Sequence, residues 1–203
     1  MQTSVTGAFS KCEPDQAARF VRFRFPRCVN RATGLPHPSR TPMFIASTMT
    51  QPAPTSMTPA GLEAYLREKI PLSRAMEVHV IENSATRLVL EAPLAANINH
   101  VGSAFGGSLH ALPTLACYSA LWTIMREGGT DGHVVVKHSE ASYRSPVKGR
   151  LRAICLRPPQ PVIARFLEDL RRHKKARMEL DAIVEGEAGK PAVEFHGTFV
   201  AII

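Results

Sequence analysis

The chain of 203 residues lacks several features that would assign it to a familiar class. Residues 1–57 contain no apolar run long enough for a secretory signal or a membrane span. None of the four cysteines lies in a Cys-x-x-Cys pair or beside a suitable histidine, so neither a metal site nor a disulfide is expected. Aromatic residues make up only 6% of the chain, and no nucleic-acid recognition motif is present. We therefore predict a cytoplasmic protein that binds neither nucleic acid nor membrane.

Charge and composition divide the chain into two parts. The formal net charge is +8, and residues 1–57 carry seven Lys or Arg against two Asp or Glu. This leader is rich in Pro, Ser, Thr and Gln, and it shows no sustained periodicity. Residues 1–57 are therefore predicted to be a disordered tail or an over-extended gene start, and residues 58–203 to form one folded domain.

The most informative segment is a polar loop that leads into an apolar helix. Residues 97–110 read Asn-Ile-Asn-His-Val-Gly-Ser-Ala-Phe-Gly-Gly-Ser-Leu-His, and an apolar stretch follows from Ala111 to Met125. The first amides of a helix have no intrahelical partner, and glycine allows a ligand to approach them closely. Amides around Gly106 and Gly107 could thus polarise an acyl carbonyl and stabilise an oxyanion.

The surrounding segments predict a sheet around that helix. They mix β-branched and apolar residues in partial alternation, which is typical of strands with one buried face. The order is two strands, the apolar helix and then four strands, and a helix that is apolar nearly all round must be covered by its sheet. The predicted strands span residues 77–82, 87–92, 133–143, 150–156, 176–185 and 192–203.

From about Gly61 to Ile203 the chain resembles the putative thioesterase family of the hot-dog superfamily, a domain that follows an acetyltransferase domain in some bacteria. The resemblance rests on Ile70–Ser73, Ala92–Leu94, Asn97–His100, Ala104–Leu109, Ser139, Tyr143, Pro146–Val147, Arg165–Leu167 and Gly197–Val200. It implies an α+β hot-dog fold, in which an antiparallel sheet wraps a long central helix, and an acyl-CoA thioesterase without a cofactor.

Related hot-dog thioesterases usually carry a carboxylate on the central helix about two turns beyond the glycine pair. In this chain Thr114 stands nearest that position, and the predicted helix carries no Asp or Glu before Glu127. The resemblance therefore favours catalysis by Asn99 and Ser108 with the amides of Gly106 and Gly107. His100 and Glu140 are alternative general bases. Predicted substrate-binding residues are Asn97, Phe105, Thr114, Leu72, Met76, Ser139 and Tyr143.

Each polar candidate also has a structural interpretation. Asn97 and Asn99 could close the loop through side-chain bonds to the backbone, and Ser108 could cap the helix. His100 could be an exposed loop residue, and His110 is predicted to be a core histidine with its hydrogen bonds satisfied.

Basic residues are concentrated between Arg144 and Arg177, where eleven Lys or Arg stand against two acids. Such a cluster could bind the phosphates of coenzyme A or attract an acidic acyl carrier protein. It could equally be a solvated basic surface. The candidates for phosphate binding are Arg144, Lys148, Arg171, Arg172 and Lys174.

Two further expectations concern the ends of the domain. Residues 57–73 predict an amphipathic helix with Thr58 as N-cap and Pro59 at its first position, ended by Pro71. In the related family two sheets join edge to edge, so we predict a homodimer or tetramer with the 137–143 strand at the seam.

The predicted function is hydrolysis of an acyl-CoA or acyl-carrier thioester by direct attack of water. No Gly-x-Ser-x-Gly motif supplies a covalent nucleophile. The missing helix carboxylate leaves a non-catalytic acyl-thioester sensor as the alternative. A hot-dog enoyl hydratase or dehydratase is a third possibility. Such enzymes normally need a His together with an Asp or Glu, and the glycine loop lacks that pair.

Overall fold

A computed structural model describes residues 57–186 and 190–203. The predicted leader lies almost wholly outside these residues. The elements are α1 (Pro59–Lys69), α2 (Pro71–Ala75), β1 (His79–Asn83), β2 (Arg87–Ala92), the 3-10 turn η1 (Ala95–Asn97), α3 (Gly106–Glu127), β3 (His133–Tyr143), β4 (Leu151–Leu156), α4 (Gln160–His173), β5 (Lys175–Glu185) and β6 (Pro191–Ile202). The predicted sequence of elements is confirmed.

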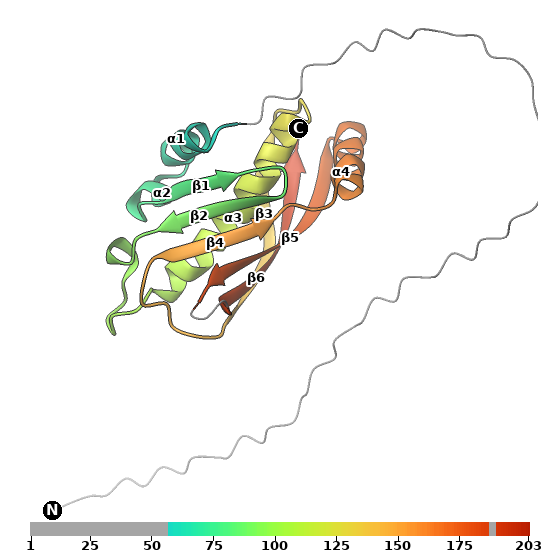
Figure 1. The fold of residues 1–203 in the computed structure, drawn as a ribbon. Coiled ribbons are helices and arrows are strands. Elements are labelled where there is room, and N and C mark those ends of the chain that lie inside the picture. The colour runs from blue at the N-terminus through green and yellow to red at the C-terminus, as the bar shows by residue number, and fades with distance from the viewer. Residues whose placement is uncertain (1–56, 187–189) are drawn as a thin grey trace, which may run out of the picture. The chain divides into compact units, whose positions relative to one another are not determined.

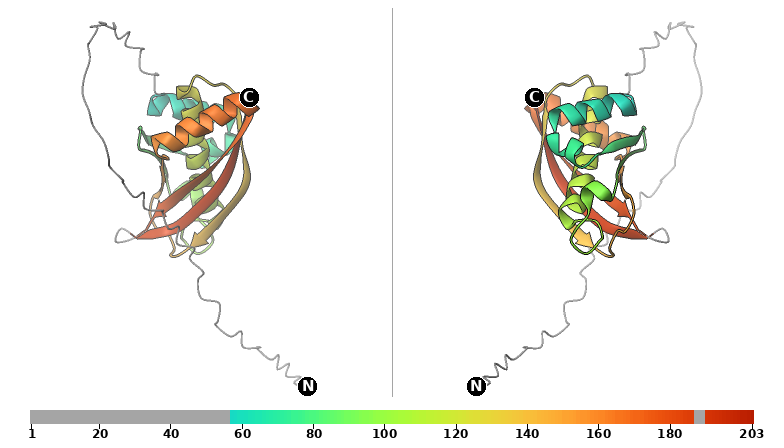
Figure 2. Two further views of the ribbon diagram at one scale, coloured as in Figure 1. Left: turned by 90° about the vertical axis from the view of Figure 1, so that its right-hand side faces the viewer. Right: turned by 90° about the vertical axis from the view of Figure 1, so that its left-hand side faces the viewer.

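The six strands form one antiparallel sheet in the order β1-β2-β4-β5-β6-β3 (Figure 1). The strands curve around α3, as Figure 2 shows. Strand β5 alternates strictly between exposed and buried residues, so one of its faces packs on the helix and the other faces solvent. Strand β3 is at one end of this order, so its outer edge has no neighbouring strand in the described part of the chain.

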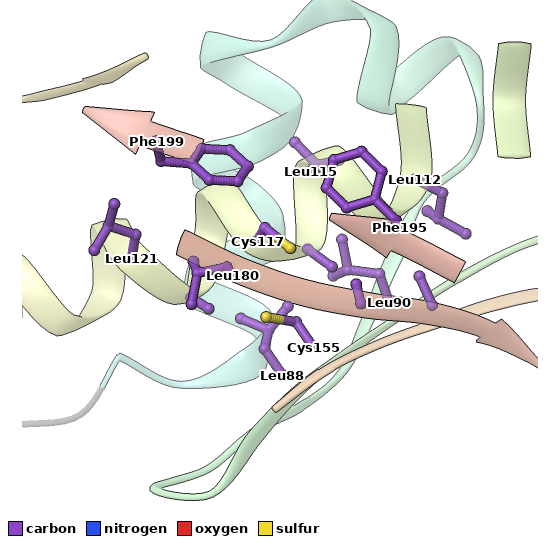
Figure 3. Close-up of a cluster of buried hydrophobic side chains, with 14 of the residues drawn as sticks. Leu88, Leu90, Leu112, Leu115, Cys117, Leu121, Cys155, Leu180, Phe195 and Phe199 are labelled. Atoms are coloured by element: carbon purple, nitrogen blue, oxygen red, sulfur yellow. The ribbon is translucent and has the colours of Figure 1, made fainter. Parts of the chain in front are cut away.

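Helix α3 is the centre of the core because its apolar residues leave little polar surface. Thirteen of its 22 residues are buried, and they contact side chains from β2, β4, β5 and β6. Figure 3 shows Cys117 of α3 and Cys155 of β4 among leucines in this layer, with Phe195 and Phe199 of β6 nearby. Both thiols are free and buried, as predicted, and burial raises the pKa of Cys117 well above its usual value.

The N-terminal helix begins as predicted but ends earlier. Thr58 accepts a hydrogen bond from the Gly61 amide at 3.1 Å, and Pro59 occupies the first turn. The chain then leaves the helical conformation at Ile70, and Pro71 starts the separate helix α2. A proline disfavours helical geometry in the residue before it but fits a first turn, so the expected single helix is divided.

Candidate functional site

An apolar groove of about 660 Å³ opens between α2, α3 and β3. Its α3 wall is a single stripe at helical spacing, from Gly107 through His110 and Thr114 to Tyr118. The full lining is Ile70, Leu72, Ser73, Met76, Gly107, His110, Ala111, Thr114, Leu115, Tyr118, Val136 and Ser139. Of the residues predicted to bind substrate, Leu72, Met76, Thr114 and Ser139 therefore line one groove.

One end of the groove is the N-terminus of α3. The N-cap residue is Phe105, and no side chain caps the helix, so the amides of Gly106, Gly107 and Ser108 have no intrahelical acceptor. A Cβ atom on Gly107 would collide with the ring of Phe105. Glycine at this position thus allows the aromatic ring to lie against the backbone.

A histidine and a serine meet beside these amides. His110 Nε2 lies 3.1 Å from Ser139 Oγ, and both residues line the groove. The imidazole also packs edge-on against Phe195, with ring centroids 5.3 Å apart. His110 is one turn beyond Gly107, so its ring belongs to the same helix face as the exposed glycine. It is the one imidazole in the groove lining and the structural candidate for a base.

A bulge in β3 decides which of its residues face the groove. The register with β6 shifts between Val136 and His138, so Lys137 is an extra residue. As a result Val136 and Ser139 line the same groove although they are three positions apart. Further along β3, the Tyr143 hydroxyl donates a hydrogen bond to the Gly106 carbonyl at 3.1 Å, which joins this strand to the start of α3.

The chain is similar to one known family and to several solved structures. Residues 60–203 match the family described as Putative thioesterase (yiiD_Cterm). A protein of unknown function from Chlorobaculum tepidum TLS is 31% identical, with 72% of this chain and 98% of that chain covered and a TM-score of 0.69. A putative thioesterase from Shewanella oneidensis is 26% identical, with 71% and 97% covered and a TM-score of 0.65.

This chain belongs to that thioesterase family. A probable thioesterase from Pseudomonas aeruginosa, 22% identical with 71% and 96% covered and a TM-score of 0.56, shares the fold. The hot-dog architecture expected from the sequence is therefore confirmed.

The two loop asparagines have structural roles in this member of the family. Asn99 Oδ1 accepts hydrogen bonds from the amides of Val101 and Ser103, and its Nδ2 donates to Ser103 Oγ and the Ala104 carbonyl. Asn97 is buried, and its Nδ2 donates to the carbonyls of Met76 and Pro93. Both side chains hold the loop in shape, and neither lines the groove.

Three residues expected in catalysis lie away from the groove. Ser108 is about a quarter-turn around α3 from Gly107, so only its backbone amide points to the site. His100 is an exposed loop residue. Glu140 is opposite His196, which is opposite Asp181, so it lies on the solvent face of the sheet. Because side chains alternate along β3, Glu140 and Ser139 lie on different faces of the sheet.

The outer-face histidine differs from His110 in its surroundings. His196 Nδ1 lies 2.7 Å from Asp181 Oδ1. The hydrogen bond to Asp181 raises the pKa of His196, with smaller contributions from the charges of Asp181, Glu179 and Glu140. This cluster lies on the outer face of the sheet, and none of its residues lines the groove.

The predicted phosphate-binding cations do not gather at one place in a single chain. Arg144 follows Tyr143 and pairs with Glu194, and Lys148 follows Val147, whose carbonyl accepts the Ala104 amide at 2.7 Å. These two are therefore near the start of α3. Arg171 instead donates to the Gly128 carbonyl at the other end of α3, and Arg172 and Lys174 are close to it in sequence. The sequence could not show this separation because it depends on where α4 packs.

The described residues contain no group of three or more potential metal ligands. Among their helices, none is both long and apolar enough to cross a membrane.

Proposed function

We propose that this protein hydrolyses acyl thioesters, with coenzyme A or an acyl carrier protein as the thiol. The supporting observation is that unpaired helix amides and the His110–Ser139 pair meet at one end of an apolar groove. An acyl chain in the groove would place its thioester carbonyl against the amides of Gly106 and Gly107. Those donors would then stabilise the negative charge that develops on the carbonyl oxygen.

The reaction needs a base, and His110 is the candidate. His110 would accept a proton from water as the water oxygen bonds to the thioester carbon, with Ser139 orienting the imidazole or the water. Collapse of the tetrahedral intermediate breaks the carbon–sulfur bond. The imidazolium then returns its proton to the departing thiolate, so the products are a free thiol and a carboxylic acid. No residue is consumed in this sequence.

The decisive experiment measures thiol release from acyl-CoAs by the full chain and by His110→Gln. We expect kcat/KM to fall at least about a hundredfold in the variant, because loss of a general base removes a contribution of that size. His196→Gln is the matched control, since it makes the same change on the outer face of the sheet. Full activity in folded His110→Gln would refute the proposed base.

A non-catalytic acyl-thioester sensor is the second candidate, and one observation favours it. The twelve groove-lining residues include no Asp or Glu, although hot-dog thioesterases of the related type usually carry a carboxylate there. A sensor would bind acyl-CoA saturably without releasing thiol. An enoyl hydratase would instead change the absorbance of enoyl-CoA, and the lack of a carboxylate beside His110 argues against it.

We also propose a homodimer formed through the free edge of β3. This edge is eleven residues long and exposes Val135 and Val136. Phe105, Val101 and Ile98, on the loop before α3, are also exposed, with Val101 at 70%. A long exposed apolar edge is normally covered in a native assembly. A second copy paired with β3 would extend the sheet and cover the mouth of the groove.

Light scattering of the eluting peak tests this assembly. Val135→Lys should shift the protein toward monomer, because a buried charge would replace an apolar contact. Val162→Lys on α4 is the matched control, since that valine has the same 48% exposure as Val135. A parent that elutes as a monomer would contradict the proposal.

Arg144 and Lys148 are proposed to contact the phosphates of coenzyme A, because both lie near the N-terminus of α3, at one end of the groove. Charge contacts weaken with salt. We therefore expect KM for acyl-CoA to rise with ionic strength, while KM for an N-acetylcysteamine thioester of the same acyl group stays constant.

A further inference from the structure

The groove is lined by an aromatic side chain at the end of the α3 stripe farthest from Gly107. Its α3 wall stops at Tyr118, whose hydroxyl lies 3.1 Å from the hydroxyl of Tyr65 on α1. The Tyr65 ring stacks on Trp122 with centroids 4.1 Å apart, and the Arg126 guanidinium lies 5.6 Å from the Trp122 ring centroid. These side chains brace one another, so Tyr118 is held in place.

The Tyr118 hydroxyl is uncharged. Burial of the hydroxyl, together with the hydrogen bond to Tyr65, raises the pKa of Tyr118. The hydroxyl therefore stays protonated at physiological pH, and its polar atom is occupied by Tyr65. The surface offered to a ligand at this point is the ring of Tyr118, next to Leu115 and Ile70.

The length of the groove follows from the helix. Gly107 and Tyr118 are eleven positions apart, which corresponds to about 16 Å along the axis. A helical side chain covers the turn before its own Cα, so the Tyr118 ring shortens this path by roughly one turn, to about 11 Å. With carbon–carbon bonds of about 1.5 Å in a zigzag, an extended acyl chain advances roughly 1.3 Å per carbon. About eight to ten carbons therefore fit.

We propose that Tyr118, braced by Tyr65 and Trp122, sets the substrate class as medium-chain acyl thioesters of about eight to ten carbons. The proposal rests on the proposed thioesterase function and adds a specificity-determining residue to it. Leu72, Met76, Ala111 and Leu115 line the path between the amides and this aromatic wall.

The test is the chain-length profile of thiol release by the full chain, with saturated acyl-CoAs from four to sixteen carbons. In the parent, kcat/KM should rise by up to about fourfold per added methylene and then fall beyond about ten carbons. Tyr118→Ala should move the optimum to about twelve to fourteen carbons and raise the C14-to-C8 ratio of kcat/KM at least about tenfold. Tyr118→Phe keeps the ring, so its optimum should move by no more than one two-carbon step.

Two further variants keep the result interpretable. Thr114→Phe puts a ring one turn nearer Gly107, and the optimum should shorten to about four to six carbons. Leu170→Ala removes a fully buried side chain of α4 that does not line the groove, so it controls for lost stability and should leave the optimum unchanged. An unchanged profile in folded Tyr118→Ala, or a parent that prefers sixteen carbons, would overturn the proposal.

Calorimetric binding of octyl-CoA and tetradecyl-CoA thioethers separates this proposal from the proposed activity. If no thioester is hydrolysed but the octyl ether binds more tightly, and this preference reverses in Tyr118→Ala, the length limit stands and the thioesterase function fails. If thioesters are hydrolysed but neither thiol release nor thioether binding depends on chain length, the thioesterase function stands and the length limit fails.

Discussion

The two ends of α3 are built in opposite ways. At the N-terminal end the amides of Gly106, Gly107 and Ser108 have no side-chain cap, and Phe105 is 57% exposed. At the C-terminal end Arg171 donates to the Gly128 carbonyl, and the guanidinium of Arg157 makes two hydrogen bonds to Glu127. The helix is therefore anchored by side chains at its C-terminal end, whereas the amides at its N-terminal end are left without a side-chain cap.

The N-terminal end of α3 is held in place through the segments next to it in the fold. The two guanidinium groups of Arg150 and Arg152 donate to the Glu91 carboxylate at 2.7 and 2.6 Å. These arginines follow the loop whose Val147 carbonyl accepts the Ala104 amide. The position of the unpaired amides thus depends on contacts made by neighbouring segments, since the helix start has no cap of its own.

The largest effect on activity is expected from a substitution at the N-terminal end of α3. In Gly107→Ala, the added methyl group would collide with Phe105 and displace the amides, so kcat/KM should fall about a hundredfold, as when an oxyanion donor is lost. Gly149→Ala is the control, because a Cβ there meets no atom within 4 Å. Equal thioesterase activity of the two folded variants would show that the Gly107 amide is not used.

Removing a contact at the C-terminal end of α3 should lower the free energy of unfolding and leave thioesterase activity unchanged. The Arg157 side chain is only 3% exposed, and Arg157→Met would leave Glu127 without its partner, so we expect a loss of about 3 kcal/mol in the free energy of unfolding. Arg87→Met removes an exposed ion pair with Glu82 and should cost under about 1 kcal/mol. Urea denaturation measures both, and equal losses would contradict the comparison.

The contribution of Glu91 and its two arginine partners to the stability of the fold should depend on pH. Burial alone would raise the pKa of Glu91, but its hydrogen bonds to Arg150 and Arg152 outweigh this and hold the pKa below its usual value. A carboxylate with a lowered pKa stabilises the fold above its unfolded pKa, and that contribution is lost as pH falls through the folded pKa. Glu91→Gln should therefore flatten the loss of stability between about pH 5 and pH 3. Parallel pH curves for variant and parent would refute this role.

The smallest effect is expected at Ser108. Its side chain makes no hydrogen bond to another described residue and does not line the groove, so only its amide belongs to the site. Ser108→Ala should change kcat/KM by less than about twofold and stability by less than about 0.5 kcal/mol. A large loss of activity would restore the catalytic role that the sequence suggested for this hydroxyl.

Much of this molecule could be predicted from local patterns. The strands, the start of α3 at the glycine pair, the Thr58 cap and the burial of Cys117 and Cys155 all follow from periodicity and residue chemistry. Leu72 and Met76, which the sequence analysis proposed to bind substrate, line the groove. The structure places Asn99 in hydrogen bonds within its own loop and Glu140 on the outer face of the sheet. Whether a polar side chain closes its own loop or faces a pocket depends on neighbours that are distant in sequence.

The sequence by itself determined that a glycine pair would open a buried helix inside an antiparallel sheet, because helix starts and strand alternation are set by residues a few positions apart. Only the tertiary structure decided which side chains meet at that opening. The bulge at Lys137 turns Ser139 toward His110, and the packing of α1 beside α3 brings Tyr65 to Tyr118. Both contacts join residues 29 or more positions apart, so no local pattern could specify them.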